Sequence, residues 1–216
     1  MRLCSAKNIM GELLNTFNPK QVLVRELHEG HRAKILEHLL ALDETDRQLR
    51  FGMHVSDEMI SAYVEKLSFT ADTLFGVFNH DLQLDGLAHL AYSKNKDQTT
   101  AEFGVSVSAR ARSLGVGSAL FKRAATHARN ANITTLYVHC LASNKVMMHI
   151  AKKAGMDIDF AYGEADAFLK LPASTNSSIV SEAVQAQMAD IDYALKKNFQ
   201  RSKTFFMHTL SLKRIH

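Results

Sequence analysis

Residues 107–124 read VSARARSLGVGSALFKRA, and this stretch decides how the rest of the chain is interpreted. Arg110 and Arg112 alternate with alanines, and Gly115 and Gly117 then open a run of residues typical of a helix. The first turn of a helix has unpaired backbone N–H groups and a partial positive charge, so it attracts anions. Glycine lets a ligand approach the backbone closely. The stretch therefore predicts a site for a phosphate-bearing ligand.

Two well-known phosphate-binding loops do not match this stretch. A P-loop requires Gly-x-x-x-x-Gly-Lys-Ser/Thr, which does not occur in the chain. A dinucleotide-binding fingerprint requires a third glycine three residues after Gly117, where the chain has Leu120. What remains is Arg112-x-x-Gly115-x-Gly117, a pattern that by itself also fits a tight turn with solvated arginines.

The segments around this pattern alternate between strand and helix. Hydrophobic periodicity and turn residues predict strands at 21–27, in a hairpin over 73–93, at 99–108, at 134–141 and on both sides of Gly163. The same signals predict helices over 30–43, over 57–67 with Ser56 as its cap, over 115–130, and over 145–153 with Ser143 or Asn144 as its cap. The residues between the first of these helices and Ser56 read as a polar turn. This order predicts an α/β sheet that begins antiparallel and has a strand–helix–strand crossover in its second half.

The end of the chain predicts one more helix after a linker. The tract PASTNSS at 172–178 is rich in turn residues. Beyond it, apolar residues recur at helical spacing: Val180, Val184, Met188, Ile191 and Leu195. This helix is expected to pack on the domain or on a second copy of the chain, which leaves a homodimer open.

Composition bounds the class of protein. The chain has 216 residues, of which 46% are hydrophobic and 22% charged, as in ordinary globular domains. Its two cysteines, Cys4 and Cys140, form no disulfide framework or metal-binding spacing and favour a reducing compartment. The first residues lack the features of a secretory signal, and no apolar run reaches the roughly 20 residues of a membrane span. We therefore expect a cytoplasmic protein with no membrane partner.

The net charge of +4 gives little support to a nucleic-acid partner. The basic residues are scattered, and neither an aromatic-interleaved RNA motif nor a zinc-finger spacing occurs. A basic nucleic-acid binder would show affinity that falls steeply with salt. The closest histidine pair, His28 and His31, has no third ligand near it in the sequence, so we expect no metal site.

The span from Thr100 to Met156 resembles the acetyl-CoA-binding core of the GNAT N-acetyltransferase superfamily. Its members have a strand, an Arg/Gln-x-x-Gly-x-Gly/Ala loop, a helix, a second strand, and then an asparagine followed by a helix that ends near a glycine. Here these are AEFGVSV, the loop from Arg112 to Gly117, SALFKRAATHARN, TTLYVHCL, Asn144 and AGM. The resemblance implies a mixed, mostly antiparallel sheet with a splayed parallel strand pair, helices on both faces and a C-terminal helical extension. It also implies an extension at 1–19, an acetyltransferase domain at 20–171, and a linker with a terminal helix at 172–216.

The resemblance implies acetyl-CoA as cosubstrate and a role for each part of the loop. Beside Arg112, backbone N–H groups should hold the diphosphate of coenzyme A, and they come from Ser113, Leu114, Gly115, Val116, Gly117 and Ser118. The backbone of Val105 and Val107 should bind the pantetheine arm like an added strand. Asn144 would contact the arm from the other side, or would serve only as a helix cap.

Acetyl transfer to an amine requires a neutral nucleophile. A lysine-like ammonium with a pKa near 10.4 is deprotonated in only about one molecule in 2,500 at pH 7. A positioned carboxylate is the common remedy. Glu102 lies ten residues before Arg112, the interval at which relatives carry a catalytic glutamate, and the strand period places it on the face of Gly104 and Ser106. The alternative is a strand glutamate that pairs with a basic neighbour.

The group that protonates the leaving thiolate is left open. Many relatives have a tyrosine seven residues after the asparagine, where this chain has Ala151. His139 and Cys140 are candidates, although each also fits ordinary packing. A thiol pKa near 8.5 makes the thiolate a tolerable leaving group without a dedicated acid.

Three further segments are similar to the GNAT domain of Pat-type bacterial protein-lysine acetyltransferases: DETDRQLRFG, SDEMISAYVEKL and NKVMMHIAKKAGM. Arg50 and Phe51 in the first segment line the acceptor site or brace two helices. The acceptor is thus expected to be a small-molecule amine or a protein lysine, and the transfer to occur directly in a ternary complex. The alternatives are a Pat-like protein-lysine acetyltransferase and a catalytically silent acyl-CoA-binding module.

Overall fold

The computed structural model describes residues 21–93 and 99–212. It contains a seven-stranded sheet in the order β1-β2-β3-β4-β5-β7-β6. The strands are β1 Arg25–Leu27, β2 Thr73–Phe78, β3 Leu84–Tyr92, β4 Thr100–Val107, β5 Thr135–Leu141, β6 Asp157–Ala161 and β7 Glu164–Lys170. All neighbouring strands are antiparallel except β4 and β5, which are parallel. The predicted extension at 1–19 lies outside the described residues.

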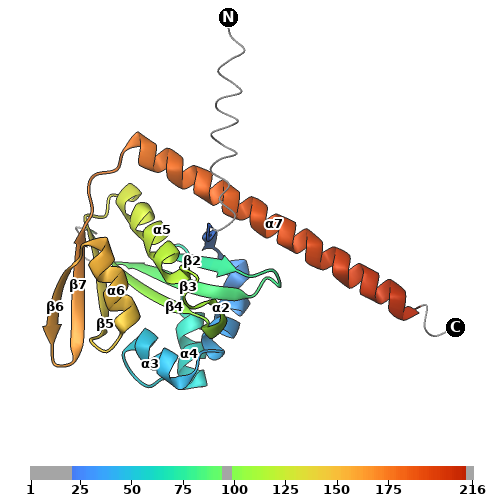
Figure 1. Ribbon diagram of the computed structural model, residues 1–216, viewed down its shortest axis with the longest axis horizontal. Helices are drawn as coiled ribbons and strands as arrows, with labels where there is room; N and C mark the ends of the chain where they lie inside the picture. The colour runs from blue at the N-terminus through green and yellow to red at the C-terminus, as the bar shows by residue number, and fades with distance from the viewer. Residues whose placement is uncertain (1–20, 94–98, 213–216) are drawn as a thin grey trace, which may run out of the picture.

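Helices cover both faces of the sheet (Figure 1). They are η1 Glu29–His31, α2 Arg32–Leu40, α3 Glu44–Phe51, α4 Asp57–Glu65, η2 Ala109–Ala111, α5 Val116–Asn130, α6 Lys145–Ala154 and α7 Asn176–Leu212. One hydrophobic cluster joins the sheet to α5 and α6, and a second joins the sheet to α2 and α4. The expected α/β architecture, with its parallel pair in the middle of the sheet, is confirmed.

Local capping explains where several helices begin. The Ser56 hydroxyl accepts a hydrogen bond from the Met59 N–H at the start of α4, as its position predicted. The prediction of a polar turn before Ser56 is wrong, because α3 lies there. Asp43 caps α3 by accepting from the Asp46 N–H at 2.8 Å, and Gly52 ends it with a left-handed φ of 74°.

The terminal helix starts earlier than predicted. Residues 172–175 of the polar tract connect β7 to α7, and only residues 176–178 belong to the helix. Thr175 Oγ1 accepts a hydrogen bond from the Ser178 N–H at 3.2 Å and so caps α7. The helix packs on the domain, one of the two expected alternatives. Arg25 Nε and Asp190 Oδ1 are 2.8 Å apart, and the Lys196 ammonium donates to the carbonyl of Phe78.

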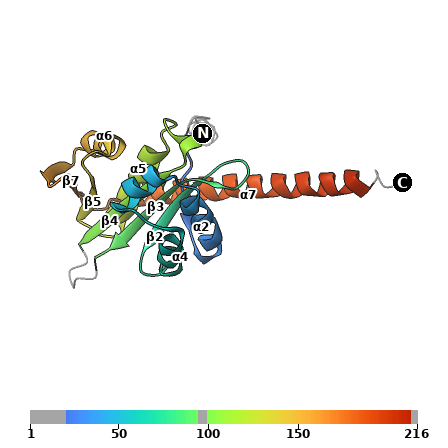
Figure 2. The same ribbon diagram turned by 90° about the horizontal axis from the view of Figure 1, so that it is seen from below.

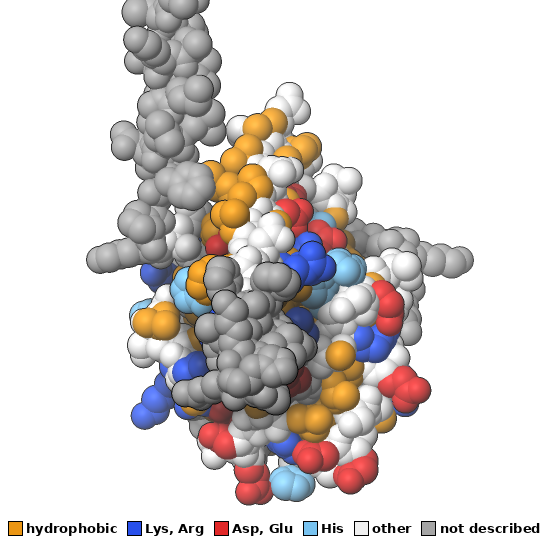
Figure 3. Space-filling model, turned by 90° about the vertical axis from the view of Figure 1, so that its right-hand side faces the viewer, with side chains coloured by type: hydrophobic (Ala, Val, Ile, Leu, Met, Phe, Trp, Pro, Cys, Tyr) orange, Lys and Arg blue, Asp and Glu red, His pale blue; other side chains and the backbone are white. Residues whose placement is uncertain are grey.

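Beyond these contacts α7 projects away from the body of the molecule (Figure 2). Figure 3 shows a band of hydrophobic side chains on this side of the molecule. The exposed apolar residues of α7 include Ile179, Val180, Val184, Ile191, Leu195 and Phe199. None of the helices in residues 21–93 and 99–212 is long and apolar enough to cross a bilayer.

Candidate active site

The loop before α5 has two residues in the left-handed backbone conformation. Ser113 has a φ of 61° and Gly115, the N-cap of α5, has a φ of 79°. The Ala119 N–H bonds to the Gly115 carbonyl at 3.0 Å. The N–H groups of the preceding first turn of α5 have no carbonyl within the helix to bind. The loop therefore has backbone donors of the kind that bind an anion.

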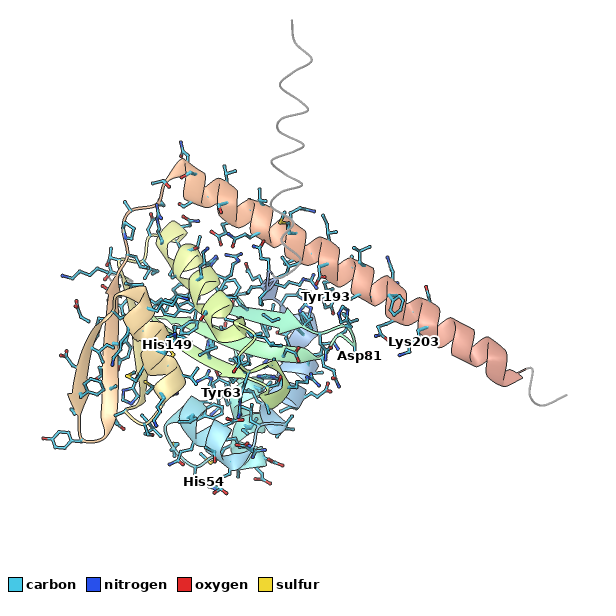
Figure 4. The ribbon with its side chains drawn as sticks, viewed as in Figure 1. His54, Tyr63, Asp81, His149, Tyr193 and Lys203 are labelled. Carbon is cyan, nitrogen blue, oxygen red and sulfur yellow. The ribbon has the colours of Figure 1, made fainter. Side chains whose placement is uncertain are left out.

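A cavity of about 410 Å³ lies in front of this loop. From the predicted cofactor residues its lining includes Val107, Arg112, Ser113, Gly115, Val116, Gly117 and Ser118. Lys145 and His149 of α6 also line it, and Figure 4 shows His149 on that helix. Leu114 differs from the others because its side chain is exposed and lines another cavity, near β1. Lys145 was not among the predicted cofactor residues, and it adds positive charge beside the loop 112–117.

A second cavity, of about 250 Å³, adjoins the first along β4. We call it the β4 cavity, and it shares Val107, Arg112 and Gly117 with its neighbour. Its full lining is Leu42, Thr45, Asp46, Leu49, Arg50, Val105, Ser106, Val107, Arg112, Gly117, Asn144, Val146, Met147 and Ile150. The structure thus brings Val105, Val107, Asn144 and the loop 112–117 together around two neighbouring cavities.

Beside these cavities one edge of β4 is open. The parallel pairing joins Thr100–Glu102 to Thr135–Tyr137 and goes no further along β4. From Phe103 to Val107 the strand is bonded to β3 on one side, and no described strand pairs with its other side. This is the splay that the family resemblance implied. An extended ligand can bind such an edge through backbone hydrogen bonds.

Arg112 does not stand free at the mouth of the loop. Its guanidinium forms an ion pair with Asp46 of α3, and the Arg112 side chain is 48% exposed while that of Asp46 is 18% exposed. Burial raises the pKa of the Asp46 carboxyl, although the charge of Arg112 opposes this shift. The pair ties α3 to the loop 112–117.

Asn144 is the N-cap of α6. Its Oδ1 accepts a hydrogen bond from the Met147 N–H at 3.0 Å, and the residue also lines the β4 cavity. The capping alternative of the sequence analysis is thereby confirmed for Asn144 rather than Ser143. Among the described residues no hydrogen bond uses the amide NH₂ group of Asn144.

We expect two substitutions to separate these roles. Asn144→Ala should lower the free energy of unfolding by about 1 kcal/mol, because the cap is lost. Asn144→Asp keeps the accepting oxygen, so it should retain wild-type stability while weakening acetyl-CoA binding through loss of the amide donor. Thermal unfolding and calorimetry measure the two effects. An Asp variant as unstable as the Ala variant would contradict the capping role.

Glu102 lies on β4 with an exposed side chain, away from both cavity linings. Its β5 neighbour in the register is Tyr137, and its β3 neighbour is Ala91. The uninterrupted register places Glu102, Gly104 and Ser106 on one face, as predicted. Within residues 21–93 and 99–212 Glu102 makes no ion pair, so the alternative of a strand glutamate paired with a basic neighbour is not supported.

A chain of polar side chains that the sequence analysis missed lies on the same face. Tyr63 of α4 has its hydroxyl 2.8 Å from His89 Nδ1, and His89 Nε2 lies 3.1 Å from Asp72 Oδ2. Arg50 Nη2 donates to the Tyr63 hydroxyl at 3.1 Å (Tyr63 is labelled in Figure 4). Burial, followed by the charge of Arg50, lowers the pKa of His89. These residues come from segments far apart in the chain. Of them, only His89 lies in a stretch with the alternating pattern of a strand.

His139 and Cys140, the two candidates for the acid that protonates the leaving thiolate, lie in different surroundings. His139 Nδ1 lies 2.8 Å from Asp166 Oδ1, and this hydrogen bond is the main cause that raises the pKa of His139. Cys140 is buried, and burial raises the pKa of its thiol.

His28 and His31 cap the short helix η1 reciprocally. No cluster of metal-binding side chains occurs among the described residues.

Comparisons with known proteins agree with this geometry. The model of the acetyltransferase (GNAT) family matches residues 40–156, more than half of the chain. The solved GNAT domain of PAT from S. lividans is 16% identical, with a TM-score of 0.59, and the match covers 68% of this chain and 89% of that one. Spermidine N-acetyltransferase from Vibrio cholerae, solved with CoA and spermine, is 19% identical, with a TM-score of 0.54 and coverages of 68% and 94%.

A putative acetyltransferase from Salmonella typhimurium, solved with its cofactor acetyl-CoA, is 15% identical, with a TM-score of 0.53 and coverages of 70% and 95%. At these identities the solved structures show the shared fold. The comparison with curated proteins finds no match. The matched residues include the loop 112–117, the open edge of β4 and α6, the helix that Asn144 caps. The chain therefore belongs to the acetyltransferase (GNAT) family, whose members transfer an acetyl group from acetyl-CoA to an amine.

Proposed function

We propose that this chain acetylates a cationic primary amine by direct transfer from acetyl-CoA, with Glu102 as general base. The observation that carries the proposal is the row of N–H groups at the start of α5 that have no partner among the described residues. They face cavities beside the edge of β4 that no described strand pairs with. A diphosphate on those N–H groups and a pantetheine arm along that edge would aim the thioester at the point where β4 and β5 separate.

In this arrangement each predicted cofactor residue has a defined task. Residues 113–118 hold the diphosphate through their backbone, and Arg112 and Lys145 add positive charge beside it. The backbone of Val105 and Val107 holds the arm. Because backbone groups bind the arm, valine side chains suffice at these positions and remain packed against the core.

The acceptor side is acidic. Glu102 shares its sheet face with Tyr137, and the next strand carries the half-exposed carboxylates of Glu164 and Asp166. Beyond the hydrogen bond that His139 donates to Asp166, the charges of Glu164 and Glu102 also raise the pKa of His139, so these carboxylates lie within electrostatic range of one site. Such a surface attracts an ammonium group, from which Glu102 removes a proton directly or through water.

A Pat-like protein-lysine acetyltransferase is the second candidate. The fold shared with the S. lividans PAT domain and the exposure of Glu102, Asp159 and Glu164 favour it, because an open surface admits a lysine carried on a protein. A small polyamine would be acetylated by the same reaction. A catalytically silent acyl-CoA-binding module would bind the cofactor but release no thiol in the presence of any amine.

The test combines calorimetry with a thiol-release assay. Acetyl-CoA and desacetyl CoA should both bind saturably, and thiol release should depend on one class in a panel of monoamines, polyamines and lysine peptides. A nucleic-acid binder would instead show salt-dependent affinity for DNA or RNA. Absence of acetyl-CoA uptake at millimolar ligand would refute the proposal. Uptake without thiol release across the panel would leave only the silent module.

A further inference from the structure

Ser106 of β4 and His38 of α2 form a buried hydrogen-bonded pair beside the β4 cavity. The Ser106 Oγ lies 2.9 Å from His38 Nε2, and the two residues are 7% and 5% exposed. Ser106 lines the β4 cavity together with Val105 and Val107. The hydroxyl therefore lies next to the edge along which the thioester arm is proposed to run, although amine acetylation with Glu102 as the base has no use for it.

The surroundings of His38 fix the direction of this hydrogen bond. Its Nδ1 lies 3.0 Å from the carbonyl oxygen of Leu84, which can only accept, so Nδ1 carries the proton. The lone pair of Nε2 then faces Ser106, whose hydroxyl donates to it. Burial lowers the pKa of His38, which keeps the ring neutral near pH 7. A hydroxyl, a neutral base and a group that orients the base are the parts of an activated nucleophile.

A cation stands on the same face of β4. Arg50 lines the β4 cavity, and its guanidinium lies over Gly104, where an added Cβ would be 2.7 Å from Nη1. Gly104 and Ser106 are two residues apart and share one face. The Arg50 Nε is buried without a hydrogen-bond partner among the described residues. A spare donor on a cation can stabilise the oxyanion of a tetrahedral adduct at Ser106.

From this arrangement we infer that Ser106 is a second nucleophile, which takes the acetyl group of acetyl-CoA when no amine is present and gives the chain a slow thioesterase activity. The inference rests on the proposed function, since acetyl-CoA must occupy the β4 cavity. It also requires the thioester to lie beside Ser106, short of the point where β4 and β5 separate. It differs from amine acetylation in the residues used, because Ser106 and His38 act here instead of Glu102.

The reaction has two balanced halves. First, Ser106 Oγ attacks the thioester carbonyl carbon while its proton moves to His38 Nε2. The C–S bond then breaks, and the same proton passes to the thiolate, which leaves free coenzyme A and an acetyl ester on Ser106. Second, water attacks the ester carbon and gives a proton to Nε2. The C–O bond to Ser106 breaks, the serine oxygen regains that proton, and acetic acid leaves and ionises.

The experiment uses the full chain and acetyl-CoA without amine. Thiol release is followed with a thiol reagent, and acid-quenched samples are examined by intact mass and peptide mapping. We expect thiol release and one acetyl group on the peptide that contains Ser106. Ser106→Ala should abolish both signals, and His38→Gln should slow them by about 100-fold or more because the base is lost. Ser108→Ala is the matched control and should change neither, since the Ser108 hydroxyl faces Asp85 instead.

The variants also separate this inference from the proposed function. Glu102→Gln should keep the acetyl label on Ser106, and Ser106→Cys should form a thioester in place of the ester. Thermal unfolding and calorimetry verify that each variant is folded and binds acetyl-CoA. Wild-type protein that binds acetyl-CoA but gives neither thiol nor label would overturn the inference and leave the proposed function standing. Thiol release by Ser106→Ala at the wild-type rate would also overturn it, and failure to bind acetyl-CoA would overturn both.

Discussion

Glu102→Gln should lower kcat/KM for amine acetylation by about 10²- to 10⁴-fold and leave acetyl-CoA affinity unchanged. The variant keeps the size of the side chain but cannot take a proton from the incoming ammonium. Only about one amine in 2,500 is neutral at pH 7, so the reaction depends on that step. Steady-state thiol release gives the first quantity and calorimetry the second.

The control for this experiment is Glu37→Gln. It removes a carboxylate from an exposed position of α2, away from the acidic face, and it should change kcat/KM by no more than about twofold. Full activity of Glu102→Gln would mean that another group is the base. The chain of Tyr63, His89 and Asp72 would then be the next candidate, because it lies on the same face of the sheet.

Glu182→Gln should lower the free energy of unfolding at pH 7 by on the order of 3 kcal/mol, or roughly 10 °C in Tm. Burial alone would raise the pKa of Glu182, but hydrogen bonds from His127, Asn130 and Arg123 outweigh it and lower the pKa from 4.5 to about 2. Arg123 is only 3% exposed, so the variant also leaves a buried cation without its carboxylate.

The pH dependence identifies the cause of this loss. A carboxyl with a depressed folded pKa contributes its full stability above about pH 4.5 and loses it as the pH falls toward 2. The Tm difference between wild type and variant should therefore be large at pH 7 and shrink near pH 3. The exposed Glu37→Gln is the control and should have nearly wild-type Tm at both pH values. An equal difference at both pH values would show that the charge of Glu182 is not the cause.

Local chemistry made much of the fold predictable. Gly115 and the helix behind it, the caps Ser56 and Asn144, and the alternation of β4 all depend on residues close in sequence, and the structure has each of them. The missed helix α3 has mostly polar residues, so hydrophobic periodicity gave no signal there. Asp43 and Gly52, which bound it, were the signal available.

The candidate site was predictable only in the part that lies along one segment. The loop and β4 carry most of the predicted cofactor residues within a short stretch of chain. His38 reaches Ser106 across 68 positions, and Tyr63 reaches His89 across 26. Such pairs depend on how α2 and α4 lie on the sheet, and packing of this kind leaves no pattern in a single sequence.

The hydrogen bonds of Glu182 join α7 to α5. α5 begins at the loop 112–117. Arg123 in the middle of α5, and His127 and Asn130 near its far end, all bond to the Glu182 carboxylate of α7. α7 continues well past the body of the molecule (Figure 2), and its contacts through Asp190 and Lys196 lie between Glu182 and the projecting end. A partner that pulls on this end would act on those contacts first, and on α5 only after them, through Glu182.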